Sequence, residues 1–146
     1  MIRAAVGLAM LAVTLGACAA AKPAPRAVGN LSVEDLIAGG RLSGPYLEKA
    51  IRDAAQYPLG SEQNPVRADM PAGQRAYLAR LRCADGTPPS YARKGLLQAT
   101  PFGSLVDGFE VRCRNGSPER TTIAMDMYHP GYAEQLPPQG FTLAAP

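Results

Sequence analysis

The chain contains a single histidine, His129, in the segment AMDMYHPG. A histidine beside a serine and a carboxylate can act as the base that activates a nucleophile. Ser104, Asp107 and His129 follow one another along the chain in the order serine, acid, base. Ser104, however, lies in FGSLVDG and not in the G-x-S-x-G turn that exposes such a serine between a strand and a helix. The sequence therefore does not favour a catalytic triad.

The same region also offers ligands for a metal ion. Asp126 lies three residues before His129, and Asp107 or Glu134 could complete a set. One histidine among scattered carboxylates is a weak pattern for zinc, so we predict no metal ion and no cofactor. We interpret Asp126 as a solvent-facing residue of a strand, and His129-Pro130-Gly131 as the turn that ends this strand.

Arginine residues form the more informative pattern. The stretch 75–120 carries eight basic and four acidic residues, a local charge of +4 in a chain whose formal net charge is +3. The guanidinium group suits phosphate and carboxylate groups, so Arg82, Arg112 and Arg114 are predicted to bind an anion. The alternative is a solvated face whose arginines keep the sheet soluble. The mild net charge and the absence of tryptophan argue against nucleic acid as a partner.

The N-terminal segment MIRAAVGLAMLAVTLGACAA has one cation, Arg3, before an uncharged run that ends in small residues. This pattern is typical of an export signal, and the run is too diluted by Ala, Gly and Thr to favour a membrane-spanning helix. Leu15-Gly16-Ala17-Cys18 resembles the lipobox of bacterial lipoproteins. The alternative is cleavage after Ala17, Ala19 or Ala21, which would leave a soluble secreted or periplasmic protein.

The resemblance to bacterial lipoproteins implies that Cys18 becomes the lipidated first residue of the mature protein. It also implies a location in the cell envelope, and Ala19 after the cysteine implies the outer membrane, by a sorting rule of enteric bacteria. The residues after Cys18 are small residues and prolines, which predict an extended tether. We therefore divide the chain into a signal peptide (1–17), a lipidated cysteine with its tether (18–30) and one globular domain (31–146).

The two remaining cysteines, Cys83 and Cys113, are an even pair in an exported chain, and oxidation to a disulfide is expected there. Each cysteine lies on the apolar face of an alternating stretch that ends just after it. With one strand between them, their Cα atoms would be about 9 to 10 Å apart, beyond the roughly 7 Å limit for a disulfide. The two strands are therefore predicted to be parallel neighbours or to belong to two facing layers. As neighbours they would place Arg80 opposite Glu110 and Arg82 opposite Arg112.

The elements that must carry these residues begin with two short helices. Ser32 can cap the first helix, which Gly39-Gly40 ends. Ser43 or Gly44 can cap the second, with Pro45 at its first position, and the stretch 57–73 is predicted to be a loop.

Alternation of apolar and polar residues then predicts strands at 74–83, 109–114 and 122–127, with a weaker edge strand at 91–99. Asn115-Gly116 predicts the turn of a hairpin.

Together these patterns predict an α+β fold: two short N-terminal helices, then a small, mostly antiparallel sheet of about four strands braced by one disulfide. The expected function is that of an envelope-anchored lipoprotein of unknown specific activity, most simply a non-enzymatic accessory, binding or structural module. Its expected partners are a membrane, through the lipid, and an anionic envelope component. The alternative is a small periplasmic hydrolase or metal-dependent enzyme that uses Asp107, Asp126 and His129.

Overall fold

The structure, a computed structural model, describes residues 41–97 and 101–146. The predicted signal peptide (1–17), Cys18 with its tether (18–30) and the first predicted helix lie outside the described residues. Within the described residues, no helix is long and apolar enough to cross a membrane.

The described chain forms an α+β fold with a mostly antiparallel sheet and one disulfide, as the sequence predicts. A five-stranded sheet has the order β3-β4-β5-β1-β6, and a second sheet pairs β2 with β7. Among the described strands, only β1 and β5 pair in parallel. The strands are β1 (Val66–Asp69), β2 (Leu81–Arg82), β3 (Ser90–Leu96), β4 (Val106–Arg112), β5 (Arg120–Asp126), β6 (Tyr128–Ala133) and β7 (Thr142–Leu143).

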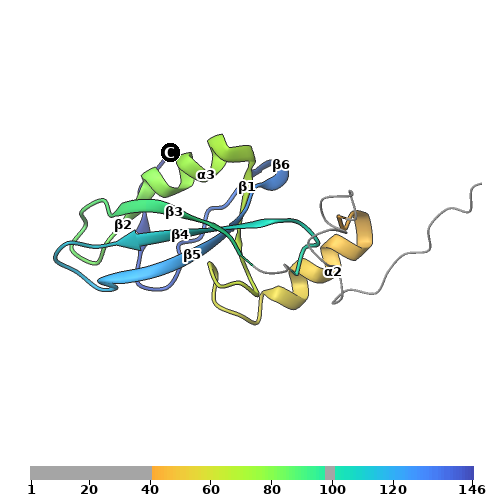
Figure 1. The fold of residues 1–146 in the computed structure, drawn as a ribbon, viewed down its shortest axis with the longest axis horizontal. Helices are drawn as coiled ribbons and strands as arrows, with labels where there is room; N and C mark the ends of the chain where they lie inside the picture. The colour runs from red at the N-terminus through yellow and green to blue at the C-terminus, as the bar shows by residue number, and fades with distance from the viewer. Residues whose placement is uncertain (1–40, 98–100) are drawn as a thin grey trace, which may run out of the picture.

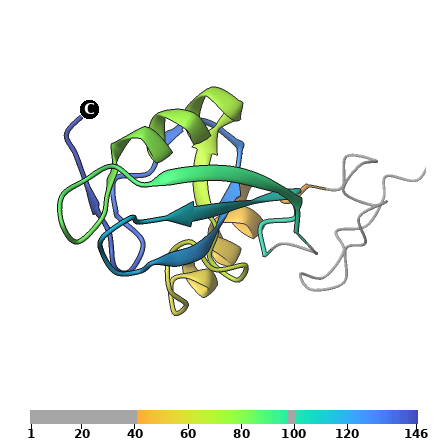
Figure 2. The same ribbon diagram turned by 60° about the vertical axis from the view of Figure 1, so that its left-hand side comes forward.

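Two helices cover opposite faces of the five-stranded sheet. Helix α3 (Met70–Arg80) packs on one face, and α2 (Gly44–Ala54) lies on the other, toward one end of the molecule (Figures 1 and 2). The predicted second helix is confirmed as α2, with a proline in its first turn.

The predicted strand at 74–83 is wrong, because most of this stretch is helix α3. Gln74, Tyr77 and Leu78 are the buried positions of α3, and their spacing is that of one helix face. The apparent alternation at Tyr77, Ala79 and Leu81 arises because the helix passes directly into the short strand β2.

The predicted loop at 57–73 is wrong in part, since it contains β1 and the start of α3.

The prediction that His129-Pro130-Gly131 forms the turn that ends a strand is also wrong. His129 belongs to β6, which pairs with β1.

The β4–β5 hairpin and the edge position of β3 agree with the sequence. In this hairpin Phe109 pairs with Ile123 and Arg112 with Arg120. Because side chains of a strand alternate between faces, Phe109, Val111, Ile123 and Met125 face α3 and join the main core. Glu110, Arg112 and Arg120 therefore lie on the face that α2 covers only at its far end.

The disulfide joins Cys83, just after β2, to Cys113, just after β4, with a Cα–Cα distance of 5.9 Å. It therefore links the two-stranded sheet to the five-stranded sheet, which corresponds to the facing-layers alternative. The predicted opposition of Arg80 to Glu110 and of Arg82 to Arg112 is wrong, because β2 pairs with β7.

Candidate functional site

A buried polar cluster brings together Ser104, Asp126 and His129. All three side chains are almost fully buried, at 3%, 0% and 7% exposure. Ser104 Oγ donates a hydrogen bond to Asp126 Oδ2, and the backbone N–H of Tyr128 donates to Asp126 Oδ1 at 2.9 Å. Asp126 is thus not a solvent-facing residue, contrary to the sequence interpretation.

His129 approaches the same carboxylate without completing a hydrogen bond. Its Nε2 atom lies 3.3 Å from Asp126 Oδ2, but the angles do not meet hydrogen-bond geometry, and Nε2 is left without a partner among the described residues. The ring packs edge-on against Phe102, with 5.5 Å between ring centroids.

This cluster does not have the geometry of a nucleophilic triad. Ser104 and His129 both face one carboxylate oxygen, whereas a serine nucleophile must donate to the histidine. Burial also closes the serine hydroxyl to a substrate. The arrangement instead satisfies a buried carboxylate, which is costly unless it is hydrogen-bonded.

Asp107 belongs to a separate cluster on the opposite face of the sheet. Its neighbour Val106 pairs with Asp126, so Asp107 points the other way, toward α3. There it accepts hydrogen bonds from Gln74 at 3.1 Å and from Arg93 Nε at 3.0 Å. The hydrogen bonds that Arg93 donates to Asp107 raise the pKa of Arg93.

Glu134 contacts neither the Asp126 cluster nor the Asp107 cluster through its hydrogen bonds. Its Oε1 accepts hydrogen bonds from the backbone N–H groups of Gln135 and Leu136. Its Oε2 accepts a hydrogen bond from the hydroxyl of Tyr132 at 3.2 Å. In the part of the chain that the structure describes, no group of three or more His, Cys, Asp or Glu residues is placed to hold a metal ion.

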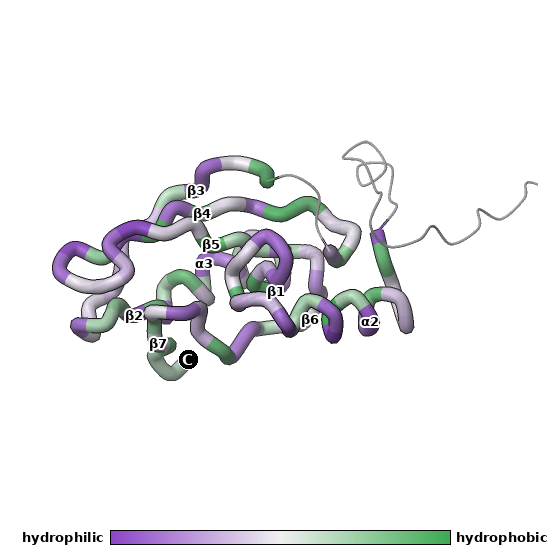
Figure 3. The backbone as a smooth tube through the Cα atoms, turned by 90° about the horizontal axis from the view of Figure 1, so that it is seen from below, coloured by the Kyte–Doolittle hydropathy of each residue, from purple (hydrophilic) through white to green (hydrophobic). Residues whose placement is uncertain are grey.

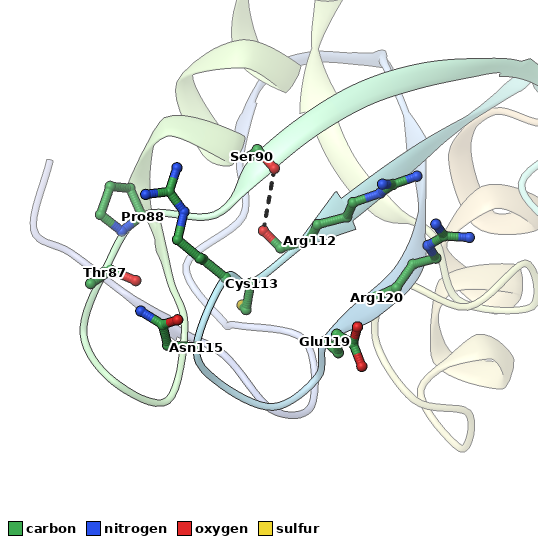
Figure 4. Close-up of a pocket in the computed structure, with 9 residues that line it drawn as sticks. Thr87, Pro88, Ser90, Arg112, Cys113, Asn115, Glu119 and Arg120 are labelled. Carbon is green, nitrogen blue, oxygen red and sulfur yellow. Dashed lines mark hydrogen bonds between the residues drawn. The ribbon is translucent and has the colours of Figure 1, made fainter.

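A surface recess of about 530 Å³ gathers arginine residues at the end of the sheet. Its walls are the loop after β2 and the β4–β5 hairpin, and the disulfide-bonded Cys113 is among the lining residues (Figure 4). Figure 3 shows hydrophilic stretches along β4 toward this end of the molecule. The lining residues are Thr87, Pro88, Ser90, Arg112, Cys113, Arg114, Asn115, Glu119 and Arg120.

Arg112 and Arg120 lie directly opposite each other on β4 and β5, and Figure 4 shows both side chains extending in the same direction. Their side chains are 51% and 61% exposed. Like charges directly opposite each other in a sheet are unfavourable. Glu110, two residues before Arg112 on the same face, offsets this repulsion.

Glu110 accepts a hydrogen bond from Arg112 Nε at 2.7 Å. Its other oxygen lies 3.7 Å from Arg120 Nε and 4.0 Å from Lys94 Nζ. The hydrogen bond from Arg112 lowers the pKa of Glu110, and the charges of Arg112, Arg120 and Lys94 lower it further.

Arg114 and Glu119 form no side-chain hydrogen bond or ion pair with the described residues, although both line the recess. Asp85 stabilises the other wall of the recess, the loop after β2. Its carboxylate accepts hydrogen bonds from the backbone N–H and the hydroxyl of Thr87, at 3.0 and 2.7 Å. These two hydrogen bonds lower the pKa of Asp85. The recess therefore combines a braced wall with an unpaired guanidinium.

Of the three arginines predicted to bind an anion, the structure brings two together. Arg112 and Arg114 line the recess, whereas Arg82 does not and donates to the carbonyl oxygens of Ala79 and Leu81. Arg120 also lines the recess, although the sequence pattern did not single it out. The hairpin signal at Asn115-Gly116 could have found it, because it places Arg120 across from Arg112.

Comparison with known proteins identifies no relative of this chain: no protein-family model, no curated protein and no solved structure matches it.

Proposed function

We propose that this protein is an envelope-anchored bacterial lipoprotein that serves as a non-enzymatic binding module for an anionic envelope component. The lipobox at Leu15-Gly16-Ala17-Cys18 supports the anchor, with the outer membrane, facing the periplasm, as its location. The observation that carries the binding role is the recess lined by Arg112, Arg114 and Arg120. Guanidinium groups favour oxyanions, which they can bind through paired N–H groups.

The position of the recess fits such an anchor. Figure 1 shows α2, near which the described chain begins, at one end of the long axis and the β4–β5 hairpin at the other. A tether before α2 would attach the domain at the end remote from the recess. In this arrangement the arginines point away from the anchoring membrane, into the periplasm.

The test is binding of the detergent-solubilised mature protein to immobilised lipopolysaccharide and to purified peptidoglycan, at low and at moderate salt. The double variant Arg112→Ala/Arg114→Ala is expected to bind at least about threefold more weakly, with a shallower salt dependence, because fixed cations are removed. The matched control is Arg52→Ala/Arg75→Ala, which removes two exposed arginines outside the recess. Equal losses in both double variants would contradict the proposal.

A further inference from the structure

The Glu110 carboxylate is surrounded by the cationic groups of Arg112, Arg120 and Lys94. One of its oxygens accepts from Arg112 and the other faces Arg120 and Lys94. An oxyanion bound between two guanidinium groups would divide its oxygens in the same way. The Glu110 side chain is only 16% exposed, whereas the arginines that surround it are more than half exposed.

Two of the cations around Glu110 belong to residues that also line the recess. Arg112 and Arg120 both line it, while Glu110 does not. A ligand that enters the recess therefore meets two cations that already share one internal carboxylate. It can use the N–H groups that face Glu110 only if it replaces the Glu110 carboxylate.

We propose, on the basis of the proposed function above, that Glu110 is an internal competitor for the recess and that a phosphate monoester displaces its carboxylate from Arg112 and Arg120. A free carboxylate has the same charge as Glu110, and it competes poorly because Glu110 is tethered beside the cations at a high effective concentration. A phosphate monoester carries about −1.5 to −2 charges at neutral pH and has three acceptor oxygens. It therefore gains more from the same two guanidinium groups.

The experiment titrates methyl phosphate into the full-length mature protein in neutral-detergent micelles and follows the backbone amide signals of Asn115 and Gly116 by NMR. Glu110→Gln is expected to bind methyl phosphate about fivefold more tightly than the wild type, which corresponds to about 1 kcal/mol. The matched control is Glu119→Gln, which removes one negative charge from the same recess but no ion pair.

High salt separates competition from a general charge effect. At about 0.5 M salt the screening length is about 4 Å, so the benefit of removing the Glu119 charge should largely vanish. The advantage of Glu110→Gln should persist, since it arises from a contact. Equal effects of the two variants would overturn the proposal, as would weaker binding by Glu110→Gln, which would make Glu110 a positioning residue.

Further arms define the ligand group. Acetate at the same concentrations should not shift the Asn115 and Gly116 signals of the wild type, and acetate binding as tight as that of methyl phosphate would overturn the assignment to phosphate. Glucose 6-phosphate and phosphatidic acid vesicles separate a sugar-borne from a lipid-borne phosphate. Tighter binding of either by Glu110→Gln supports the proposal, and binding of neither overturns it.

Loss of all binding, methyl phosphate included, would overturn the proposed function as well. Binding that is insensitive to Glu110→Gln overturns only this inference.

Discussion

At the scale of single residues, Asp126 shows how the fold handles a charge in its interior. The carboxylate is fully buried, and three groups approach it: Ser104 Oγ, the Tyr128 N–H and His129 Nε2. A buried carboxylate without donors such as Ser104 Oγ and the Tyr128 N–H would be strongly destabilising. Ser104 therefore matters as a hydrogen-bond donor to Asp126, and His129 as a neighbour of the same carboxylate, and not as a nucleophile and its base.

Asp126→Ala is expected to lower the free energy of unfolding by about 2 to 4 kcal/mol, because it leaves the Ser104 hydroxyl and the Tyr128 N–H without their acceptor and opens a small cavity. Urea denaturation measures this loss. The control is Asp53→Ala, which removes an exposed carboxylate paired with Lys49 and should change stability by no more than about 0.5 kcal/mol. A loss in Asp126→Ala no greater than in Asp53→Ala would contradict this account.

At the scale of elements, the start of α3 contains a strained residue. Met70 is the first residue of the helix and has a φ of +57°, in the left-handed region that disfavours residues with a Cβ atom. Its N–H donates to the carbonyl oxygen of Met127 at 2.8 Å, and its side chain is 52% exposed. The direct passage from β1 into α3 therefore fixes the left-handed conformation of Met70 through its backbone, and the Met70 side chain is not required for it.

Met70→Gly is expected to raise the free energy of unfolding by about 0.5 to 1 kcal/mol. Relief of the left-handed conformation is worth about 1 to 2 kcal/mol, and the greater freedom of glycine in the unfolded chain offsets part of this gain. Thermal and urea denaturation both report the change. Met70→Ala keeps the Cβ atom and should show no such gain, so a comparable gain in Met70→Ala would assign the effect to loss of the side chain.

At the scale of the whole molecule, one covalent bond and one tether define the proposed arrangement. The disulfide closes a separation of 30 residues, which the chain-entropy model values at about 3 to 4 kcal/mol. It joins the loop after β2 to the end of β4, and these two segments form the walls of the recess. The bond therefore stabilises the fold and the proposed binding surface together.

The anchor makes a separate prediction for the intact chain. Cys18→Ser should abolish incorporation of labelled fatty acid and partitioning into the detergent phase, because acyl chains supply the membrane affinity. The double variant Cys83→Ser/Cys113→Ser is the control, and it should keep the label. If the wild type takes up no labelled fatty acid and Cys18→Ser remains membrane-associated, the N-terminal segment acts as an uncleaved helix and the lipoprotein assignment is wrong.

The sequence by itself determined the features that depend on neighbouring residues. Alternation and the Asn115-Gly116 signal located the β4–β5 hairpin, and these local patterns survive because one face of each strand supplies apolar side chains to the main core. The pairing of Cys83 with Cys113 followed from counting cysteines. Arg112 and Arg114, which the sequence predicts to bind an anion, lie on or next to the β4–β5 hairpin and line the recess.

Only the tertiary structure decided the features that depend on long-range contacts. Residues 74–80 are compatible with a strand or a helix by pattern, and packing of Tyr77 and Leu78 on the sheet selected the helix. Asp126 has the charge of a surface residue, yet the segment around Phe102 and helix α2 cover its face of the sheet. The recess likewise exists because a disulfide and a hairpin bring residues 87 to 120 together. A local pattern records which face of a strand is polar, but the elements that cover this face come from elsewhere in the chain, so only the folded molecule determines whether a polar residue meets water or the core.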